Sequence, residues 1–409
     1  MATKRVLIVG GGGTGDYTAF TLRKRGFDGE ITVLSADRDR PYDRPYLSKE
    51  FLRGEIEVGK VFLHDESEYA KERIDLRLER RVTGGSLQER TLTLEGGEQV
   101  PFDVLVLGLG GTPRHLPDVP RAQNVLTLRS LSDSKQIREA LAQSSRLLLI
   151  GAGFIGAEVA ASARKLGKEV LIVEALPVPL QRALGREVGE IYAEIHRAQG
   201  VDVRTNTKVE EWHTHEERVT GVTLSDGSRQ DADLVLVAVG IEPNLELPRA
   251  LGLPIEGGGV RLDEGLRAAH GVYVGGDVAL HQHPIFRRAI RVEHWEVAKN
   301  HGRGIAASIA DGHTPYTKIP YFWSDQYDVN LEYRGHASGD DTAVWRGDRK
   351  GSSFSVFYLR DGVVEGVLSM NDSETNEAGG KLVESRRKVD PSALGDASRD
   401  LAELAGAKT

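Results

Sequence analysis

The chain has 409 residues, which is too long for one ordinary core, so we expect two or three domains. Its 39% hydrophobic and 28% charged residues are typical of a soluble globular protein, and its net charge of -8 argues against general nucleic-acid binding. The sequence contains no cysteine, which excludes a redox-active disulfide, a thiolate-ligated iron–sulfur cluster and a thiolate zinc site. Any redox chemistry must therefore belong to a bound organic cofactor.

No apolar run approaches the roughly 20 residues that span a bilayer. The first predicted strand begins almost at residue 1, which leaves no room for a signal peptide. We therefore expect a cytoplasmic protein with no membrane contact.

The first predicted element is a buried strand over residues 5–9 that runs into Gly10, Gly12 and Gly15. This G-x-G-x-x-G spacing gives a tight turn, lets a pyrophosphate approach the backbone and lets the following helix pack closely. A plain glycine turn is the alternative for such a string alone. Asp37 follows the next predicted strand, about 20 residues further on, where a ribose-binding carboxylate belongs.

Asp16 stands in the first turn of the helix that follows this loop. A carboxylate there suits the helix dipole, but it lies close to the expected pyrophosphate. We expect its side chain to point to solvent.

The pattern recurs later in the chain, with a strand over 146–150, glycines at 151, 153 and 156, a helix over 157–166 and a strand over 170–173 that ends at Glu174. Two complete units in one chain make coincidence improbable and indicate two nucleotide sites.

Further buried strands are expected at 104–107, 234–239 and 272–274, and each runs into glycines. Residues 66–73 are expected to be helical, and 76–78 and 91–94 to form exposed antiparallel strands. Past residue 315, alternating runs and a helix over about 374–386 predict an antiparallel module. The predicted fold class is therefore α/β: two Rossmann-like dinucleotide-binding domains and a C-terminal α+β antiparallel-sheet domain.

Several motifs together resemble the flavoprotein pyridine-nucleotide reductases of the glutathione-reductase fold, within their cysteine-free ferredoxin reductase branch. That branch includes the reductase components of aromatic dioxygenases, putidaredoxin reductase, rubredoxin reductase and, more distantly, apoptosis-inducing factor. The motifs are Gly10-x-Gly12-x-x-Gly15, Arg44-Pro45-Tyr46-Leu47-Ser48-Lys49, Gly151-x-Gly153-x-x-Gly156-x-Glu158, Glu174, Gly276-Asp277-Val278-Ala279, Glu293-His294-Trp295 and Phe322-Trp323-Ser324-Asp325-Gln326-Tyr327.

The resemblance implies an FAD-binding domain over 1–113 and 242–318, an NAD-binding domain over 114–241 and a C-terminal domain over 319–409. Residues expected to bind FAD are Gly10, Gly12, Gly15, Asp37, Arg44, Lys49, Val82, Arg129, Asp277, Trp295 and Trp323. Lys49 would lie near the reactive edge of the isoalloxazine. Outside the motif, Lys49 would be read as an exposed lysine and the tryptophans as core residues.

The second loop should hold the nicotinamide dinucleotide, through Gly151, Gly153, Ile155, Gly156, Glu158, Glu174, Arg182 and Gly240. Glu174 can accept both ribose hydroxyls of NADH and would repel the 2′-phosphate of NADPH, although Arg182 would soften that preference. The resemblance places Glu158 beside the nicotinamide, paired with Lys49, and makes these two the catalytic residues. Otherwise Glu158 is a carboxylate favoured by the helix dipole.

The sequence departs from the family pattern at Tyr46, at Gly108-Leu109-Gly110 and at Asp16. None of these changes removes a group that performs chemistry.

The implied activity is transfer of a hydride from NADH to FAD and then of single electrons to a ferredoxin that serves a Rieske dioxygenase or a cytochrome P450. A small acidic ferredoxin would dock near Arg287, Arg288 and Arg291, a stretch that is otherwise read as a solvated helix face. No metal site is expected; His281-Gln282-His283 is either a loop edge or a ligand pair. The protein would be a monomer or a homodimer.

Three alternatives stay open. One is an NADH oxidase or rubredoxin reductase, and another is an NADH-sensing flavoprotein like apoptosis-inducing factor. The third is a nucleotide-binding protein without catalysis.

Overall fold

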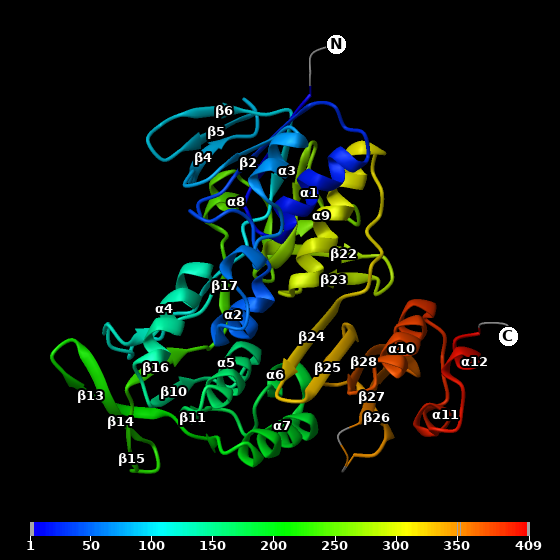
Figure 1. Cartoon of the computed structure of the whole chain (residues 1–409). Coiled ribbons are helices and arrows are strands. Elements are labelled where there is room, and N and C mark those ends of the chain that lie inside the picture. The colour runs from blue at the N-terminus through cyan, green and yellow to red at the C-terminus, as the bar shows by residue number, and fades with distance from the viewer. Residues whose placement is uncertain (1–3, 350, 352, 407–409) are drawn as a thin grey trace.

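The computed structural model describes residues 4–349, 351 and 353–406. The outer ends of the first and last predicted domains, residues 1–3 and 407–409, lie outside this range. Figure 1 shows three groups of elements: the chain's beginning and residues near 300 at the top, the middle of the chain at lower left, and the C-terminal part at lower right.

The first group is built on a six-stranded sheet in the order β20-β21-β7-β1-β2-β3, in which only β20 is antiparallel. Its strands are β1 (Arg5–Val9), β2 (Glu30–Leu34), β3 (Ile74–Arg77), β7 (Val104–Leu107), β20 (Arg267–Ala269) and β21 (Val272–Val274). The central strands are continuous apolar runs because both faces of a parallel sheet are buried. Strands from the start of the chain (β1, β2, β3 and β7) and strands from residues 267–274 (β20 and β21) thus lie in one sheet.

Helix α1 (Gly13–Lys24) follows β1 and packs closely on α9 (Trp295–Ala310). A Cβ atom at Gly302 of α9 would lie 2.5 Å from the carbonyl oxygen of Thr14, so the two backbones meet because residue 302 has no side chain.

The second group is a parallel five-stranded sheet in the order β12-β11-β10-β16-β9. Its strands are β9 (Val125–Leu126), β10 (Arg146–Ile150), β11 (Glu169–Val173), β12 (Asp202–Arg204) and β16 (Leu234–Val237). Its helices are α4 (Leu131–Ala142), α5 (Phe154–Lys165), α6 (Gln181–Leu184) and α7 (Arg186–Ala198). The β10–α5–β11 unit repeats the β1–α1–β2 unit, as the two glycine patterns predict.

The C-terminal sheet is antiparallel in the order β24-β25-β28-β27-β26 and is covered by helix α10 (Ser373–Ser385). Its strands are β24 (Tyr321–Gln326), β25 (Val329–Gly335), β26 (Thr342–Gly347), β27 (Phe354–Arg360) and β28 (Val363–Met370), and α11 (Pro391–Gly395) and α12 (Leu401–Ala405) follow. The predicted fold class is confirmed, although β24 lies outside the predicted runs.

The remaining elements are short. They comprise β4 (Val82–Ser86), β5 (Thr91–Leu94), β6 (Gln99–Pro101), β8 (Gly111–Pro113), β13 (Val209–His215), β14 (Arg218–Leu224), β15 (Arg229–Asp231), β17 (Ile241–Pro243), β18 (Ile255–Glu256), β19 (Gly259–Leu262), β22 (Ala279–His283), β23 (Arg288–Ile290), α2 (Glu50–Arg53), α3 (Glu66–Lys71), α8 (Glu246–Ala250) and the 3-10 turns η1 (Arg44–Ser48), η2 (Val58–Lys60) and η3 (Gly276–Val278). Strands β8 and β17 pair where the chain crosses between the first and second groups.

Two local predictions are wrong. Residues 76–78 were expected in an exposed antiparallel strand, whereas β3 is the parallel edge strand of the first sheet. Asp16 does not point to solvent: it is 1% exposed, because α3 packs beside α1, and the hydroxyl of Tyr69 donates to its Oδ1 at 2.5 Å. The ring of His64 lies 3.4 Å from its other oxygen.

Within the described residues, no helix is both long enough and apolar enough to cross a membrane. His281 and His283 lie in β22 and are buried against Tyr316, and no metal-binding group of three or more His, Cys, Asp or Glu side chains occurs among the residues described.

Candidate active site

A cavity of about 720 Å³ lies where the three groups of elements meet. Both glycine loops open onto it, together with residues of the η1 turn and of strand β24. The predicted residues that line it are Gly10, Gly12, Asp37, Arg44, Lys49, Arg129, Gly153, Ile155, Glu158, Gly240, Asp277, Trp295 and Trp323.

The first loop is shaped by backbone contacts that only glycine permits. Gly10 has a φ of 117°, and a Cβ atom there would lie 2.2 Å from the carbonyl oxygen of Gly108. A Cβ atom at Gly15 would lie 2.0 Å from the carbonyl oxygen of Gly10. The start of α1 is therefore held directly against the end of β1.

The second loop repeats this arrangement. A Cβ atom at Gly156 would lie 2.3 Å from the carbonyl oxygen of Gly151. Helices α1 and α5 both begin after a glycine, Gly12 or Gly153, and neither has a side-chain cap. Their first N–H groups are therefore available to an anion, and the cavity carries two sites suited to phosphates.

An acidic side chain follows the second strand of each unit. Asp37 lines the cavity, and its Oδ2 accepts a hydrogen bond from the hydroxyl of Tyr42 at 2.8 Å. Glu174 lies outside the cavity lining and accepts from the N–H groups of Ala152 at 2.7 Å and Leu176 at 2.8 Å. Each oxygen of a carboxylate has a further lone pair, so Glu174 can still accept a hydroxyl.

Two arginines bring positive charge to the middle of the cavity. Arg129 pairs with Asp277 at 2.6 Å and donates to the carbonyl oxygen of Gly111 at 2.9 Å. Arg44 donates to the carbonyl oxygen of Arg129, and burial beside this second guanidinium lowers the pKa of Arg44. Two guanidinium groups thus line one part of the cavity, an arrangement suited to a pyrophosphate such as that of FAD.

Lys49 and Glu158 both line the cavity and are almost fully buried. The sequence predicted an ion pair between Lys49 and Glu158, but in the structure each of these side chains has other partners. The Nζ atom of Lys49 pairs with Asp325 of β24 at 3.3 Å, while the two oxygens of Glu158 accept the hydroxyls of Ser48 and Ser324. Burial raises the pKa of Glu158, against the charge of Lys49 and the two hydroxyl hydrogen bonds.

Aromatic rings close the cavity. Trp295, the first residue of α9, packs on the first loop, since a Cβ atom at Gly13 would lie 2.9 Å from its ring. Trp323 lies under the Nζ atom of Lys49, at 5.9 Å from ring centre to nitrogen. Phe322 stacks on His294 with the ring centres 4.1 Å apart, and burial lowers the pKa of His294 to about 4.

Six of the residues predicted to bind FAD or NAD do not line the cavity: Gly15, Val82, Gly151, Gly156, Glu174 and Arg182. The glycines shape the loops, Val82 is next to the lining residue Arg81, and Arg182 is exposed on α6. The sequence-based predictions assigned no role to Ser48, Ser324 or Asp325, although all three lie in the motifs that carry the family resemblance.

Two phosphate-binding loops on one cavity, with a C-terminal antiparallel sheet over it, define a two-dinucleotide oxidoreductase. The chain belongs to the pyridine nucleotide-disulphide oxidoreductase family, whose profile matches residues 4–302, and a reductase C-terminal profile matches residues 321–405.

Among its relatives, a 5,5'-dehydrodivanillate O-demethylase ferredoxin reductase subunit from Sphingobium sp. is 37% identical over 98% of each chain. Putidaredoxin reductase from Pseudomonas putida is 35% identical over 99% of this chain and 98% of that one.

Two solved structures are similar along nearly the whole chain. A ferredoxin reductase of Rhodopseudomonas palustris has a TM-score of 0.93 and 33% identity, covering 98% of this chain and 100% of that one. A covalent putidaredoxin reductase–putidaredoxin complex has a TM-score of 0.95 and 33% identity, with both chains covered fully.

Substitutions at Gly12 and Gly15 should have different effects on FAD binding and on stability. A Cβ atom at Gly12 meets nothing within 4 Å, so G12A should fold normally but place a methyl group where a phosphate would lie. We expect FAD affinity to fall about tenfold or more, which is about 1.4 kcal/mol, with no change in the thermal unfolding midpoint of the flavin-free protein. G15A, which would push a methyl group into Gly10, should instead lower that midpoint.

Flavin fluorescence titration and thermal unfolding measure the two effects. The control is G59A, because Gly59 has open space around it and lies in η2, away from the cavity. Unchanged FAD affinity in G12A would show that the first loop does not hold the pyrophosphate.

Proposed function

We propose that this protein is an NADH-dependent flavoprotein reductase that delivers electrons from NADH, through FAD, to a ferredoxin-type one-electron carrier. The observation that carries the proposal is one cavity shared by two phosphate-binding loops in a chain without cysteine. FAD, when bound, takes two electrons as a hydride and returns them one at a time. Because this chain has no thiol pair to receive electrons, they must leave to a separate carrier. The named ferredoxin reductases among the relatives support this exit.

The chain's own residues bind and orient the two dinucleotides. Residues 1–113 and 242–318 would hold FAD, with the first loop and Asp37 on the adenosine side and Arg44 and Arg129 near the pyrophosphate. Residues 114–241 would hold NADH through the second loop. The C-terminal domain over 319–409 supplies Trp323, which lines the cavity and would keep water from the reacting rings.

Lys49 and Glu158 act at the junction of these parts. Lys49 presents a cation held by Asp325, and Glu158 presents a carboxylate held by two serine hydroxyls. Both would orient the nicotinamide against the flavin, so that binding energy is used to fix the transfer geometry.

The first test is anaerobic mixing of the yellow holoprotein with NADH or NADPH. About one equivalent of NADH should bleach the flavin, and NADPH should react at least about tenfold more slowly, because Glu174 repels a 2′-phosphate. E174Q loses the charge and keeps an acceptor for one of the two backbone N–H groups, so it should narrow the difference between NADH and NADPH.

The matched control is E169Q, which removes an exposed carboxylate at the other end of the same strand β11. A protein that neither contains flavin nor takes it up would contradict the proposed function. Equal flavin reduction by NADH and NADPH in the wild type would contradict the cofactor preference alone.

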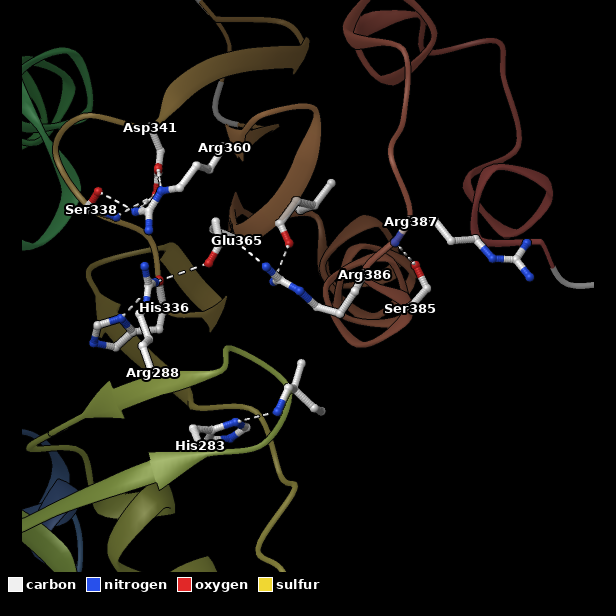
Figure 2. A network of polar contacts seen from close by, with 12 residues as sticks. His283, Arg288, His336, Ser338, Asp341, Arg360, Glu365, Ser385, Arg386 and Arg387 are labelled. Atoms are coloured by element: carbon white, nitrogen blue, oxygen red, sulfur yellow. Dashed lines mark hydrogen bonds and ion pairs between the residues drawn. The ribbon is translucent and has the colours of Figure 1, made fainter. Parts of the chain in front are cut away.

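Of the three arginines expected near the docked carrier, Arg287 is the one that we keep as the proposed docking residue. Figure 2 shows that the side chain of Arg288 points toward Glu365. It donates to the carbonyl oxygen of His336 and pairs with Glu365 at 3.1 Å. Arg386 pairs with the other oxygen of Glu365, so this carboxylate joins β23 to the C-terminal sheet. Arg291 pairs with Glu293, whereas Arg287 is exposed between β22 and β23. The segment that holds Arg288 is strand β23, not a helix face.

Charge reversal separates docking from folding. R287E should slow ferredoxin reduction and flatten its dependence on salt, while NADH-to-dye activity stays unchanged. R288E should instead lower the unfolding temperature, because it removes the ion pair and places a second carboxylate beside the buried Glu365. Stopped-flow rates over a salt series and thermal unfolding measure these effects. Unchanged ferredoxin rates and salt dependence in R287E would rule out this docking site.

A further inference from the structure

A row of buried side chains connects Glu158 of the cavity to Tyr327. Ser324 donates to Glu158 at 2.7 Å, and the side-chain amide of Gln326 lies 3.1 Å from the Oγ atom of Ser324. The Nε2 atom of His196 lies 2.9 Å from Oε1 of Gln326, and its Nδ1 atom lies 3.0 Å from the hydroxyl of Tyr327. Four hydrogen bonds thus lead away from the cavity without a break.

This row crosses the contact between the second group and the C-terminal sheet. Glu158 lies on α5 and His196 on α7, whereas Ser324 and Gln326 lie on β24. The side chains of His196, Ser324 and Gln326 have no more than 1% of their surface exposed. Water therefore does not compete for these hydrogen bonds, and each buried polar group needs the partner it has.

An ionised carboxylate can only accept, so with Glu158 charged the direction of every hydrogen bond in the row is set. The hydroxyl of Ser324 must then donate to Glu158, and it accepts in turn from the amide nitrogen of Gln326. The amide oxygen of Gln326 therefore faces His196, whose Nε2 atom must carry the proton. A neutral His196 is left with Nδ1 as an acceptor for Tyr327.

His196 stays neutral over the ordinary pH range, because burial lowers its pKa to about 4. Every donor in the row consequently points toward Glu158. Hydrogen bonds aligned in this way polarise one another, and in a buried setting they favour the charged form of the group on which they end.

Other charges act on the same carboxylate. Lys49 favours its ionised form and Asp325 opposes it, while burial opposes it most. Tyr192 lies one turn before His196 on α7 and is fully buried, and its hydroxyl has no hydrogen-bond partner among the described residues. At the far end, Tyr327 faces the charge of Arg164.

We infer that His196 and Gln326 are positioning residues for Glu158: through Ser324 they hold its carboxylate ionised and oriented in the cavity. The inference rests on the proposed role of Glu158 beside the nicotinamide. The C-terminal sheet then has a second role besides closing the cavity, since its residues Ser324 and Gln326 help to set the charge of Glu158 in the NADH-binding part.

The test uses the holoprotein and two readouts. Infrared difference spectra over a pH series follow the carboxyl band of Glu158, which E158Q identifies by its disappearance. Anaerobic flavin reduction by NADH gives a pH profile. H196L should raise the apparent pKa of Glu158 by about one unit or more, which is a tenfold change in its ionisation equilibrium. The pH profile of flavin reduction should shift by the same amount.

Rescue and control variants separate this effect from packing. H196Q restores a donor toward Gln326 and should return the titration toward the wild type. Y192F removes a neighbouring buried hydroxyl outside the row and should leave it unchanged. Should H196L fail to fold, Q326M breaks the same row from β24 and should give the same upward shift.

The possible results are distinct. An unchanged Glu158 titration in H196L or Q326M, or an equal shift in Y192F, would overturn the inference. An E158Q protein that is reduced by NADH at the wild-type rate would overturn the proposed role of Glu158, while the infrared titration would still test the row itself.

Discussion

The close contact between a helix and the strand before it governs the whole arrangement. At both glycine loops, the first turn of the helix lies against the carbonyl oxygen that ends the strand, closer than any Cβ atom would permit. This contact directs uncapped N–H groups into the cavity, where a phosphate can accept their hydrogen bonds. Because the two units carry the same contact, their phosphate sites meet one cavity from two sides, and the rest of the chain is arranged around that cavity.

Charges inside the cavity then depend on parts of the chain that are far apart in sequence. Lys49 comes from the first group, Glu158 from the second and Asp325 from the C-terminal sheet. Since a buried charge without a partner is costly, each part requires the others in place. The C-terminal sheet is therefore a component of the site as well as a cover for it, and Glu365 between Arg288 and Arg386 holds that sheet to the first group.

The sequence predicted what depends on local pattern. The two glycine loops, the strands before them and the antiparallel C-terminal module all follow from short-range periodicity, and the fold class is confirmed. Long-range contacts were not predictable in this way. The partner of Lys49 lies 276 residues away, Asp16 is buried by a helix that begins 50 residues later, and Arg288 is paired with a carboxylate of β28. In each case a residue distant in sequence determines how the side chain is paired or buried, and local sequence spacing does not identify that residue.

A crystal structure of the protein with FAD and NAD⁺ bound tests the central claim most directly. The account predicts one dinucleotide on each glycine loop, FAD at Gly10–Gly15 and NAD⁺ at Gly151–Gly156, with their reactive rings meeting between Lys49, Glu158 and Trp323. Both dinucleotides bound through the same loop, or rings that do not meet in the shared cavity, would contradict it.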